Sequence, residues 1–162
     1  MELVGVRVEL PTSTPIALLR ELNGEHRVLP IFIGGPEAAA IALALEEISP
    51  PRPMTHDLMK DLLDSLGVSI ESVTVTELRD GTFFSEIELH AKDGVHRVSS
   101  RPSDAIALAA RTGSPIFAAE GVLDEAAYPE EAEETRAEGQ SEEVVEQFRE
   151  FIDTVNPEDF AS

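Results

Sequence analysis

The stretch that most constrains the fold is residues 99–117, SSRPSDAIALAARTGSPIF, which predicts a charged turn, a helix and a return strand in one run. Pro102 suits the first turn of a helix, where its missing N–H costs nothing. Ser103 and Asp104 place side-chain oxygens near the free amides of that turn. The next six residues, AIALAA, carry no polar side-chain atoms, so the helix can lie flat against a sheet. The pattern predicts a buried helix with its polar chemistry at the N-terminal end.

A second unit of similar design lies earlier in the chain. The tripeptide HRV at 26–28 leads through LPIFIGGP into the run AIALAL, and HRV at 96–98 leads through SSRPSD into AIALAA. Each half also shows three alternating segments separated by turn residues, which is typical of antiparallel strands. The sequence therefore predicts an α+β fold with duplicated units of antiparallel strands followed by an alanine-rich helix. The alternative is coincidence in an alanine-rich chain.

Hydrophobic periodicity and turn residues predict the remaining elements. Strands are expected at 1–10, 16–22, 27–33, 68–79, 82–91, 95–100 and 116–117, and helices at 34–48, 57–66 and 122–128. Thr55 is the expected N-cap of the helix 57–66. That helix carries an apolar stripe, expected to be buried, of Leu58, Met59, Leu62, Leu63 and Leu66. The predicted organisation is a domain at 1–128, an acidic flexible linker at 129–140, and a C-terminal amphipathic helix and tail at 141–162.

The formal net charge of −20 is concentrated near the C-terminus, since residues 120–162 hold 15 Asp or Glu and two Arg. An acidic surface repels nucleic acid, so binding it would need local basic residues or bridging cations. The tail suits a basic protein partner or shields the protein from nucleic acid, and the final helix is expected to dock on its own domain or on a second subunit. With no cysteine, thiolate metal sites are excluded. No apolar run approaches about 20 residues and no basic leader opens the chain, which predicts a cytoplasmic protein without membrane contact.

Side chains suited to phosphodiester chemistry collect at the starts of three predicted helices. Arg101 could neutralise a phosphate, with Ser103 beside it in the candidate catalytic set, and His56 could act as a general base. The carboxylates that could bind Mg²⁺ or Mn²⁺ are Glu37, Asp57 and Asp104. Each residue also has a simpler structural interpretation. An Asp at a helix start usually caps the helix, His56 would face solvent, and Arg101 would pair with Asp57 or Asp104.

Three segments, 29–45, 52–67 and 100–117, resemble in order and spacing the signature of the bifunctional nuclease domain family. The resemblance covers about residues 1–125 and leaves the acidic tail outside. It implies an α+β fold that is often dimeric and a nuclease that acts on RNA and DNA. The matching positions are Pro36, Glu37, Thr55, His56, Asp57, Arg101, Pro102, Ser103 and Asp104.

The first functional hypothesis is therefore a metal-dependent nuclease without an organic cofactor. In this hypothesis Glu37, Asp57 and Asp104 bind the metal, His56 is the base and Arg101 binds phosphate. Against an efficient processive nuclease stand the ten basic residues before residue 120 and the single Tyr, which offer little for tracking a backbone or stacking bases. The alternative hypothesis is a non-catalytic homodimeric binding or regulatory module whose acidic tail recruits a basic partner.

Overall fold

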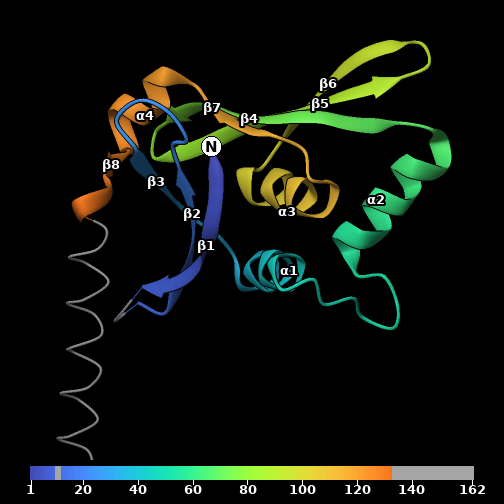
Figure 1. The fold of residues 1–162 in the computed structure, drawn as a ribbon, viewed down its shortest axis with the longest axis horizontal. Coiled ribbons are helices and arrows are strands. Elements are labelled where there is room, and N and C mark those ends of the chain that lie inside the picture. Colours follow the sequence, from blue (N-terminus) through green and yellow to red (C-terminus); the bar gives the residue numbers. More distant parts are fainter. Residues whose placement is uncertain (10–11, 133–162) are drawn as a thin grey trace, which may run out of the picture.

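Two four-stranded β-sheets form the framework of the computed structural model, which describes residues 1–9 and 12–132 (Figure 1). The strands of sheet A, in spatial order, are β1 (Glu2–Glu9), β2 (Thr14–Arg20), β3 (Arg27–Phe32) and β8 (Tyr128–Pro129). Those of sheet B are β6 (Gly94–Ser100), β5 (Thr82–Ala91), β4 (Ser69–Arg79) and β7 (Ile116–Ala118). All neighbouring strands pair antiparallel except β4 and β7, which are parallel.

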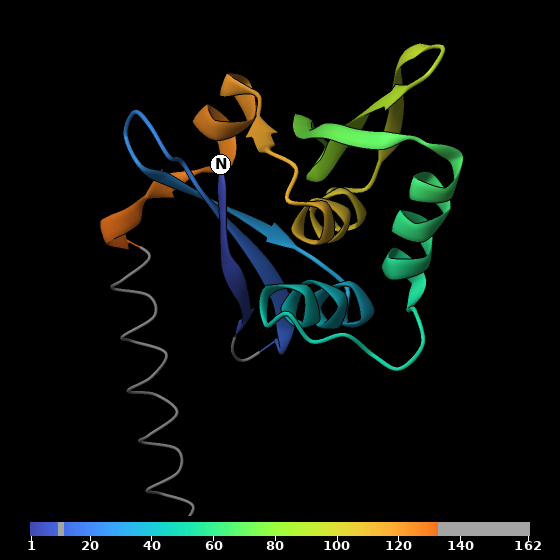
Figure 2. The same ribbon diagram turned by 45° about the vertical axis from the view of Figure 1, so that its right-hand side comes forward.

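Two alanine-rich helices, α1 (Gly35–Leu45) and α3 (Pro102–Thr112), lie against each other where the two sheets meet (Figure 2). Helix α1 packs on β1 and β2, while α3 packs on β4 and β5. The small side chains explain this arrangement, because they allow the helix backbones to approach one another and the strands closely. Helix α3 is accordingly buried along nearly its whole length, as its apolar run predicts.

One hydrophobic core joins the two halves of the molecule. It combines side chains from sheet A, sheet B, α1, α3 and the short helix α4 (Glu120–Ala126). Its largest fully buried members are Leu19, Leu29, Ile31, Ile41, Val73, Val75, Ile106 and Leu108. Since both helices contribute to the same core, neither half buries its apolar surface alone, and we expect the halves to unfold together.

The predicted α+β class is confirmed, with small shifts at the ends of the elements. Both halves contain three antiparallel strands followed by an alanine-rich helix. The two halves also differ. In sheet A the fourth strand, β8, lies beside β3, the third strand of the first half, whereas in sheet B the fourth strand, β7, lies beside β4, the first strand of the second half. In addition, helix α2 (Thr55–Leu66) follows only the first half. Descent of the two halves from one duplicated unit therefore stays a prediction.

Helix α2 departs from the sequence prediction in two ways. Its N-cap is Met54 rather than Thr55, because the Asp57 carboxylate folds back to accept a hydrogen bond from the Met54 N–H at 2.9 Å. The apolar stripe of α2 is also less covered than expected, and Leu66 is 71% exposed. The reason is that α2 packs on α3 and extends along the outer side of the molecule (Figure 1). The stripe lines an apolar groove with β4, β5 and β6.

The C-terminal part of the chain is described up to residue 132. Pro129, expected in the linker, instead pairs with Arg27 at the edge of sheet A. The rest of the predicted linker from residue 133, and the predicted amphipathic helix and tail at 141–162, lie outside the described residues. Within the described ranges, no helix is long and apolar enough to cross a membrane.

Candidate functional site

The N-terminal ends of α1, α2 and α3 meet at one charged cluster. Helix α1 contributes Glu37, α2 contributes His56, and α3 contributes Asp104 together with its N-cap residue Arg101. Local sequence explains these starts, because Pro36 and Pro102 each occupy the first helical turn, where no N–H is needed. We call Glu37, His56, Arg101 and Asp104 the helix-start cluster. The predicted convergence of the three helix starts is thus found in the structure for these four residues.

Arg101 connects the helices of this cluster. Its Nε donates to Asp104 Oδ2 at 2.8 Å, and its Nη2 donates to Asp104 Oδ1 at 3.0 Å and to Glu37 Oε1 at 2.8 Å. The Nη1 group has no hydrogen-bond partner among the described residues. Because the side chain is 66% exposed, Nη1 presents two N–H donors to solvent from a guanidinium whose other donors are fixed.

His56 shares the Asp104 carboxylate with Arg101 and is 6% exposed, contrary to the interpretation that it faces solvent. Its Nε2 lies 3.1 Å from Asp104 Oδ1. Burial raises the pKa of Asp104, but the hydrogen bonds from Arg101 and His56 lower it more, so the net pKa is below the ordinary value. An ionised carboxylate has no proton to donate, so Nε2 is the donor and Nδ1 of the neutral ring is the nitrogen that can take up a proton.

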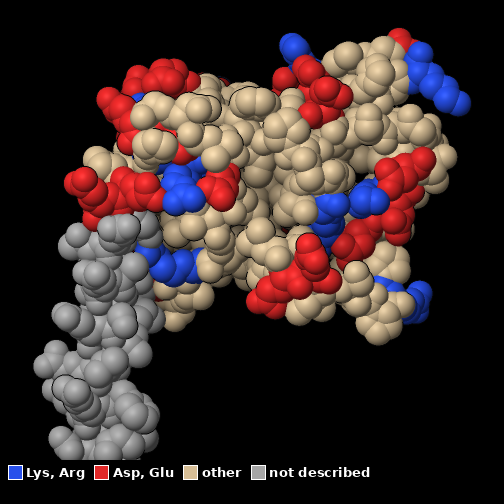
Figure 3. Space-filling view, in the orientation of Figure 1, with Lys and Arg blue, Asp and Glu red and all other residues tan. Residues whose placement is uncertain are grey.

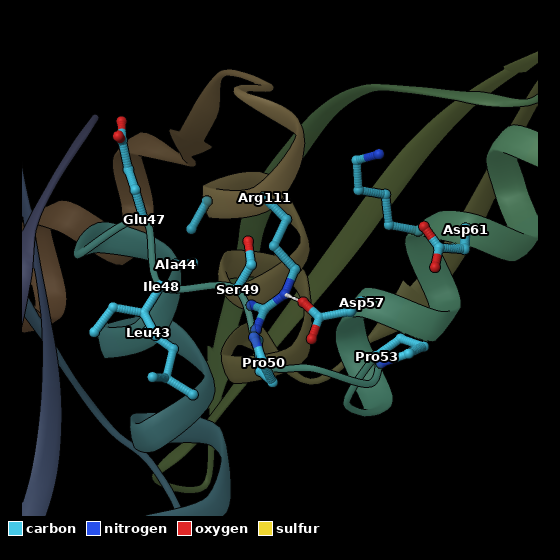
Figure 4. Close-up of a pocket in the computed structure, with 12 residues that line it drawn as sticks. Leu43, Ala44, Glu47, Ile48, Ser49, Pro50, Pro53, Asp57, Asp61 and Arg111 are labelled. Carbon is cyan, nitrogen blue, oxygen red and sulfur yellow. Dashed lines mark hydrogen bonds and ion pairs between the residues drawn. The ribbon is translucent and has the colours of Figure 1, made fainter.

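Asp57 faces a different partner, although it follows His56 directly in the sequence. Its Oδ1 accepts a hydrogen bond from Arg111 Nε at 2.5 Å, and Arg111 Nη1 donates to Ala107 O at 2.9 Å (Figure 4). The Arg111 hydrogen bond holds the pKa of Asp57 below its ordinary value. The pair borders a cavity of about 570 Å³ between the end of α1 and the start of α2. Sequence analysis missed Arg111, which seemed only a basic residue in the last turn of a helix.

The three predicted metal ligands do not form one set. Glu37 and Asp104 share the Arg101 guanidinium, whereas Asp57 is used by Arg111 and by the Met54 N–H. In the ranges 1–9 and 12–132, no group of three or more His, Cys, Asp or Glu side chains is placed to hold a metal ion. The arrangement therefore does not fit a resident metal bound by Glu37, Asp57 and Asp104 together.

A second cavity, of about 380 Å³, opens beside Arg101. Its lining includes Ser103 from the first turn of α3, Phe32 from the end of β3, Gly34 at the N-cap of α1, and Phe83 from β5. Ser103 is 7% exposed, and its hydroxyl, which keeps contact with solvent, makes no hydrogen bond to the residues that the structure describes. Phe32 and Phe83 were not singled out from the sequence. The only signal was the position of Phe32 near the end of the predicted strand 27–33, two residues before Gly34.

The surface charge of the protein is mixed. Figure 3 shows, on the face viewed, acidic groups with smaller basic groups directly beside them and no continuous basic stripe. The helix-start cluster itself carries two carboxylates and one guanidinium besides His56. A phosphate would therefore be bound by local donors at Arg101 rather than drawn in by an extended basic surface.

Comparison with known proteins identifies the family of this chain. The bifunctional nuclease domain matches residues 17–131, which include the whole helix-start cluster, and the chain therefore belongs to the bifunctional nuclease domain family. It is 46% identical over 162 residues to "Uncharacterized protein Rv1829" of Mycobacterium tuberculosis, covering 99% of this chain and 96% of that one.

Plant relatives are more distant and longer. The chain is 29% identical over 112 residues to "Bifunctional nuclease 2" of Arabidopsis thaliana, covering 66% of this chain and 34% of that protein. It is also 29% identical over 103 residues to "Bifunctional nuclease 1" of Oryza sativa subsp. japonica, covering 61% and 31%. The chain thus spans about a third of the length of these plant proteins.

Proposed function

We propose that this protein is a nuclease that hydrolyses phosphodiester bonds of RNA or DNA at the helix-start cluster. The observation that supports this most strongly is the exposed guanidinium of Arg101, which two carboxylates from different helices hold in place while Nη1 stays available. A guanidinium fixed in this way binds a phosphate without first having to be ordered. Membership of the nuclease family and the names of the plant relatives support the same reaction class.

The proposed reaction uses side chains of this chain. The Arg101 Nη1 group binds a non-bridging phosphate oxygen and stabilises the charge that develops on it. The oxygen of a water molecule forms the new bond to phosphorus while its proton passes to His56 Nδ1. The bond from phosphorus to the leaving ribose oxygen breaks, and that oxygen takes a proton from solvent. Asp104 orients the imidazole and stabilises the imidazolium.

The requirement for Mg²⁺ or Mn²⁺ expected from the sequence stays part of this proposal, although no step above passes through a bound metal. Glu37 and Asp104 outweigh the single charge of Arg101, so an incoming phosphodiester meets a site with a net charge of about −1. Divalent cations would reduce this repulsion. A cytoplasmic location and RNA or DNA as substrate are likewise part of the proposal.

His56→Gln is expected to lower cleavage of single-stranded RNA and DNA about 100-fold while the protein stays folded. The Gln amide nitrogen can still donate to Asp104, but it cannot take up a proton, so only the general-base contribution is lost. The exposed His90 supplies a matched control, because His90→Gln is expected to cleave like the wild type. Rates are measured on gels with Mg²⁺, with Mn²⁺ and with EDTA, after circular dichroism has shown that each variant is folded.

Each arm of that experiment can contradict one part of the proposal. Equal cleavage by wild type and both variants would place the activity elsewhere or in a contaminant. Cleavage that persists in EDTA would refute the metal requirement alone. The absence of cleavage by wild-type protein under all three conditions would refute the nuclease itself.

The alternative function, a homodimeric binding module, is favoured by the exposed apolar side chains of α2 and β6. Leu58, Leu62 and Leu66 on α2 and Val98 on β6 are all exposed beside the apolar groove. Such a patch is unusual on a monomer and suits a contact with a second copy of the chain. In this alternative the acidic tail, outside the described residues, recruits a basic protein.

Leu62→Lys is expected to convert a homodimer into a monomer, because a charge placed in the groove would be desolvated at the contact. Light scattering after size exclusion measures the mass. Leu22→Lys, at another exposed apolar position, is the matched control and should stay dimeric. A monomeric wild type at tens of micromolar would contradict the dimer. A dimer without nuclease activity would favour the binding module.

A further inference from the structure

The cavity beside Arg101 has two walls of different chemistry. Phe32 and Phe83 supply aromatic surface, while Arg101 and Ser103 supply hydrogen-bond donors. These residues come from the end of β3, the start of β5 and the start of α3, so the cavity lies where sheet A, sheet B and the helix-start cluster meet. Its volume of about 380 Å³ is within the range of small-ligand pockets.

Phe32 is the most unusual residue of this cavity. Its side chain is 56% exposed at the end of β3, directly before the loop that leads into α1. Its neighbours in the chain, Ile31 and Ile33, are buried. The alternation of the strand places Phe32 on the outer face, where a large apolar ring gains nothing from the core. Phe83, in contrast, is half-buried and packs against the core, so it forms a fixed wall.

Ser103 adds a polar group to the lining of the cavity. The residue is more than nine-tenths buried, lines the cavity, and has a hydroxyl without a hydrogen-bond partner among the described residues. The hydroxyl oxygen is not one of the fully enclosed side-chain atoms of the described residues, so it keeps contact with solvent while most of the residue is buried. A hydroxyl that meets the cavity is positioned to donate to, or accept from, a polar group bound there.

We propose that this cavity binds one base of a single-stranded nucleic acid, stacked on Phe32, with the adjoining phosphate on Arg101 Nη1. The proposal rests on the proposed nuclease function and names its substrate class. A base has both the apolar faces that Phe32 and Phe83 would cover and the polar edge that the Ser103 hydroxyl would meet. Base and phosphate are neighbours in one nucleotide, as the aromatic wall and the guanidinium are neighbours in the cavity.

The same geometry selects against a double helix. A paired base is stacked on both faces and bonded along its edge, so it cannot enter a concave cavity without leaving the duplex. Sequence preference is expected to be weak, since every base offers a face for stacking. The proposal also explains how a strongly acidic protein could hold nucleic acid, because stacking adds affinity that does not depend on a basic surface.

The test is the binding of fluorescein-labelled, phosphorothioate single strands that resist hydrolysis, measured by fluorescence anisotropy with the full-length chain. One strand carries normal bases, a second carries abasic sugars, and a third has normal bases in a duplex. Wild-type protein is expected to bind the normal strand about tenfold more tightly than the abasic strand or the duplex. Phe32→Ala should abolish that preference, whereas Phe117→Ala, at a half-exposed Phe on β7 outside the cavity, should retain it.

The outcomes separate the base pocket from the nuclease. If wild-type protein binds normal and abasic strands equally, or if Phe32→Ala keeps the preference, the base pocket is wrong even where cleavage is observed. Wild-type protein could prefer the normal single strand in a way that depends on Phe32 and yet cleave no strand with ordinary phosphates. That result would support the base pocket and refute the nuclease. If wild-type protein binds none of the strands, both are refuted.

Discussion

Arg101→Ala is expected to lower the rate of phosphodiester cleavage at least about 100-fold, the largest effect on activity of any substitution at the site. The variant removes the only guanidinium of the helix-start cluster and leaves Glu37 and Asp104 facing the substrate without a counter-charge. Loss of one well-placed donor to a developing oxyanion alone typically costs about 10²–10³ in kcat. Single-turnover cleavage of labelled RNA measures the effect, because it separates the chemical step from product release.

Two further variants test whether the position of Arg101 matters as well as its charge. Arg101→Lys keeps the charge but cannot hold two carboxylates with one planar group, so it is expected to recover only a small part of the activity. Gly34→Ala acts indirectly, because a Cβ at Gly34 would collide with Glu37 Oε2 and displace the carboxylate that anchors Arg101. Gly35→Ala is the control, since a Cβ there meets open space. Wild-type rates in Arg101→Ala would contradict the proposed site.

Asp57→Ala is expected to cost about 2–3 kcal/mol of unfolding free energy, the largest effect on stability that we expect from one polar substitution. Arg111 is 7% exposed on its side chain, so removing its partner leaves a buried charge without a counter-ion. The expected cost is below that of a fully buried pair because the Asp57 carboxylate is partly exposed. Urea unfolding at neutral pH measures it.

Removing the other partner is expected to cost less. Arg111→Met leaves Asp57 with the Met54 N–H and contact with solvent, and Met fills part of the space of the arginine stem. The double variant Asp57→Ala/Arg111→Met should therefore be more stable than Asp57→Ala alone. If the double variant loses the sum of the two single losses, the pair contributes no coupling and this account of α2 and α3 is wrong.

The same pair gives a pH dependence with a defined sign. The pKa of Asp57 is lowered in the folded protein from its ordinary value of 3.8. The contribution of the pair is therefore complete above about pH 4–5 and is lost as the pH falls below 3.8 through the folded pKa. The stability difference between wild type and Asp57→Asn should shrink over that range. A difference that grows toward low pH would contradict the assignment.

The fold and part of the site could be predicted from the sequence because both depend on local patterns. Alternating residues define the strands, and Pro36 and Pro102 set the starts of α1 and α3. The partners of adjacent residues could not be predicted in this way. His56 and Asp57 are neighbours in the chain, but successive side chains on a helix point about 100° apart, so one meets Asp104 and the other Arg111. For the same reason the three carboxylates did not share one ligand set.

The apolar surfaces show the same limit. The apolar stripe on α2 has the periodicity that is typical of a buried helix face. Periodicity shows only that one face of a helix is apolar. Which elements cover that face depends on where the helix packs in the folded protein. Phe32 lies among apolar neighbours in the predicted strand 27–33, and that pattern does not say which of these side chains faces outward. The pleat of β3 turns this one ring outward beside Arg101.

The placement of the site at the junction of the two halves has a consequence for how ligands could be found. Glu37 belongs to the first half of the chain, Arg101 and Asp104 belong to the second, and His56 lies on the helix between them. A compound held by all three helix starts binds the native state and loses its site when any one of them detaches. By mass action such a compound raises the melting temperature of the entire domain, by an amount that grows with the logarithm of its concentration once that exceeds the Kd. Thermal-shift screening of nucleotides and oligonucleotides can therefore detect ligands of this site before any reaction has been assayed.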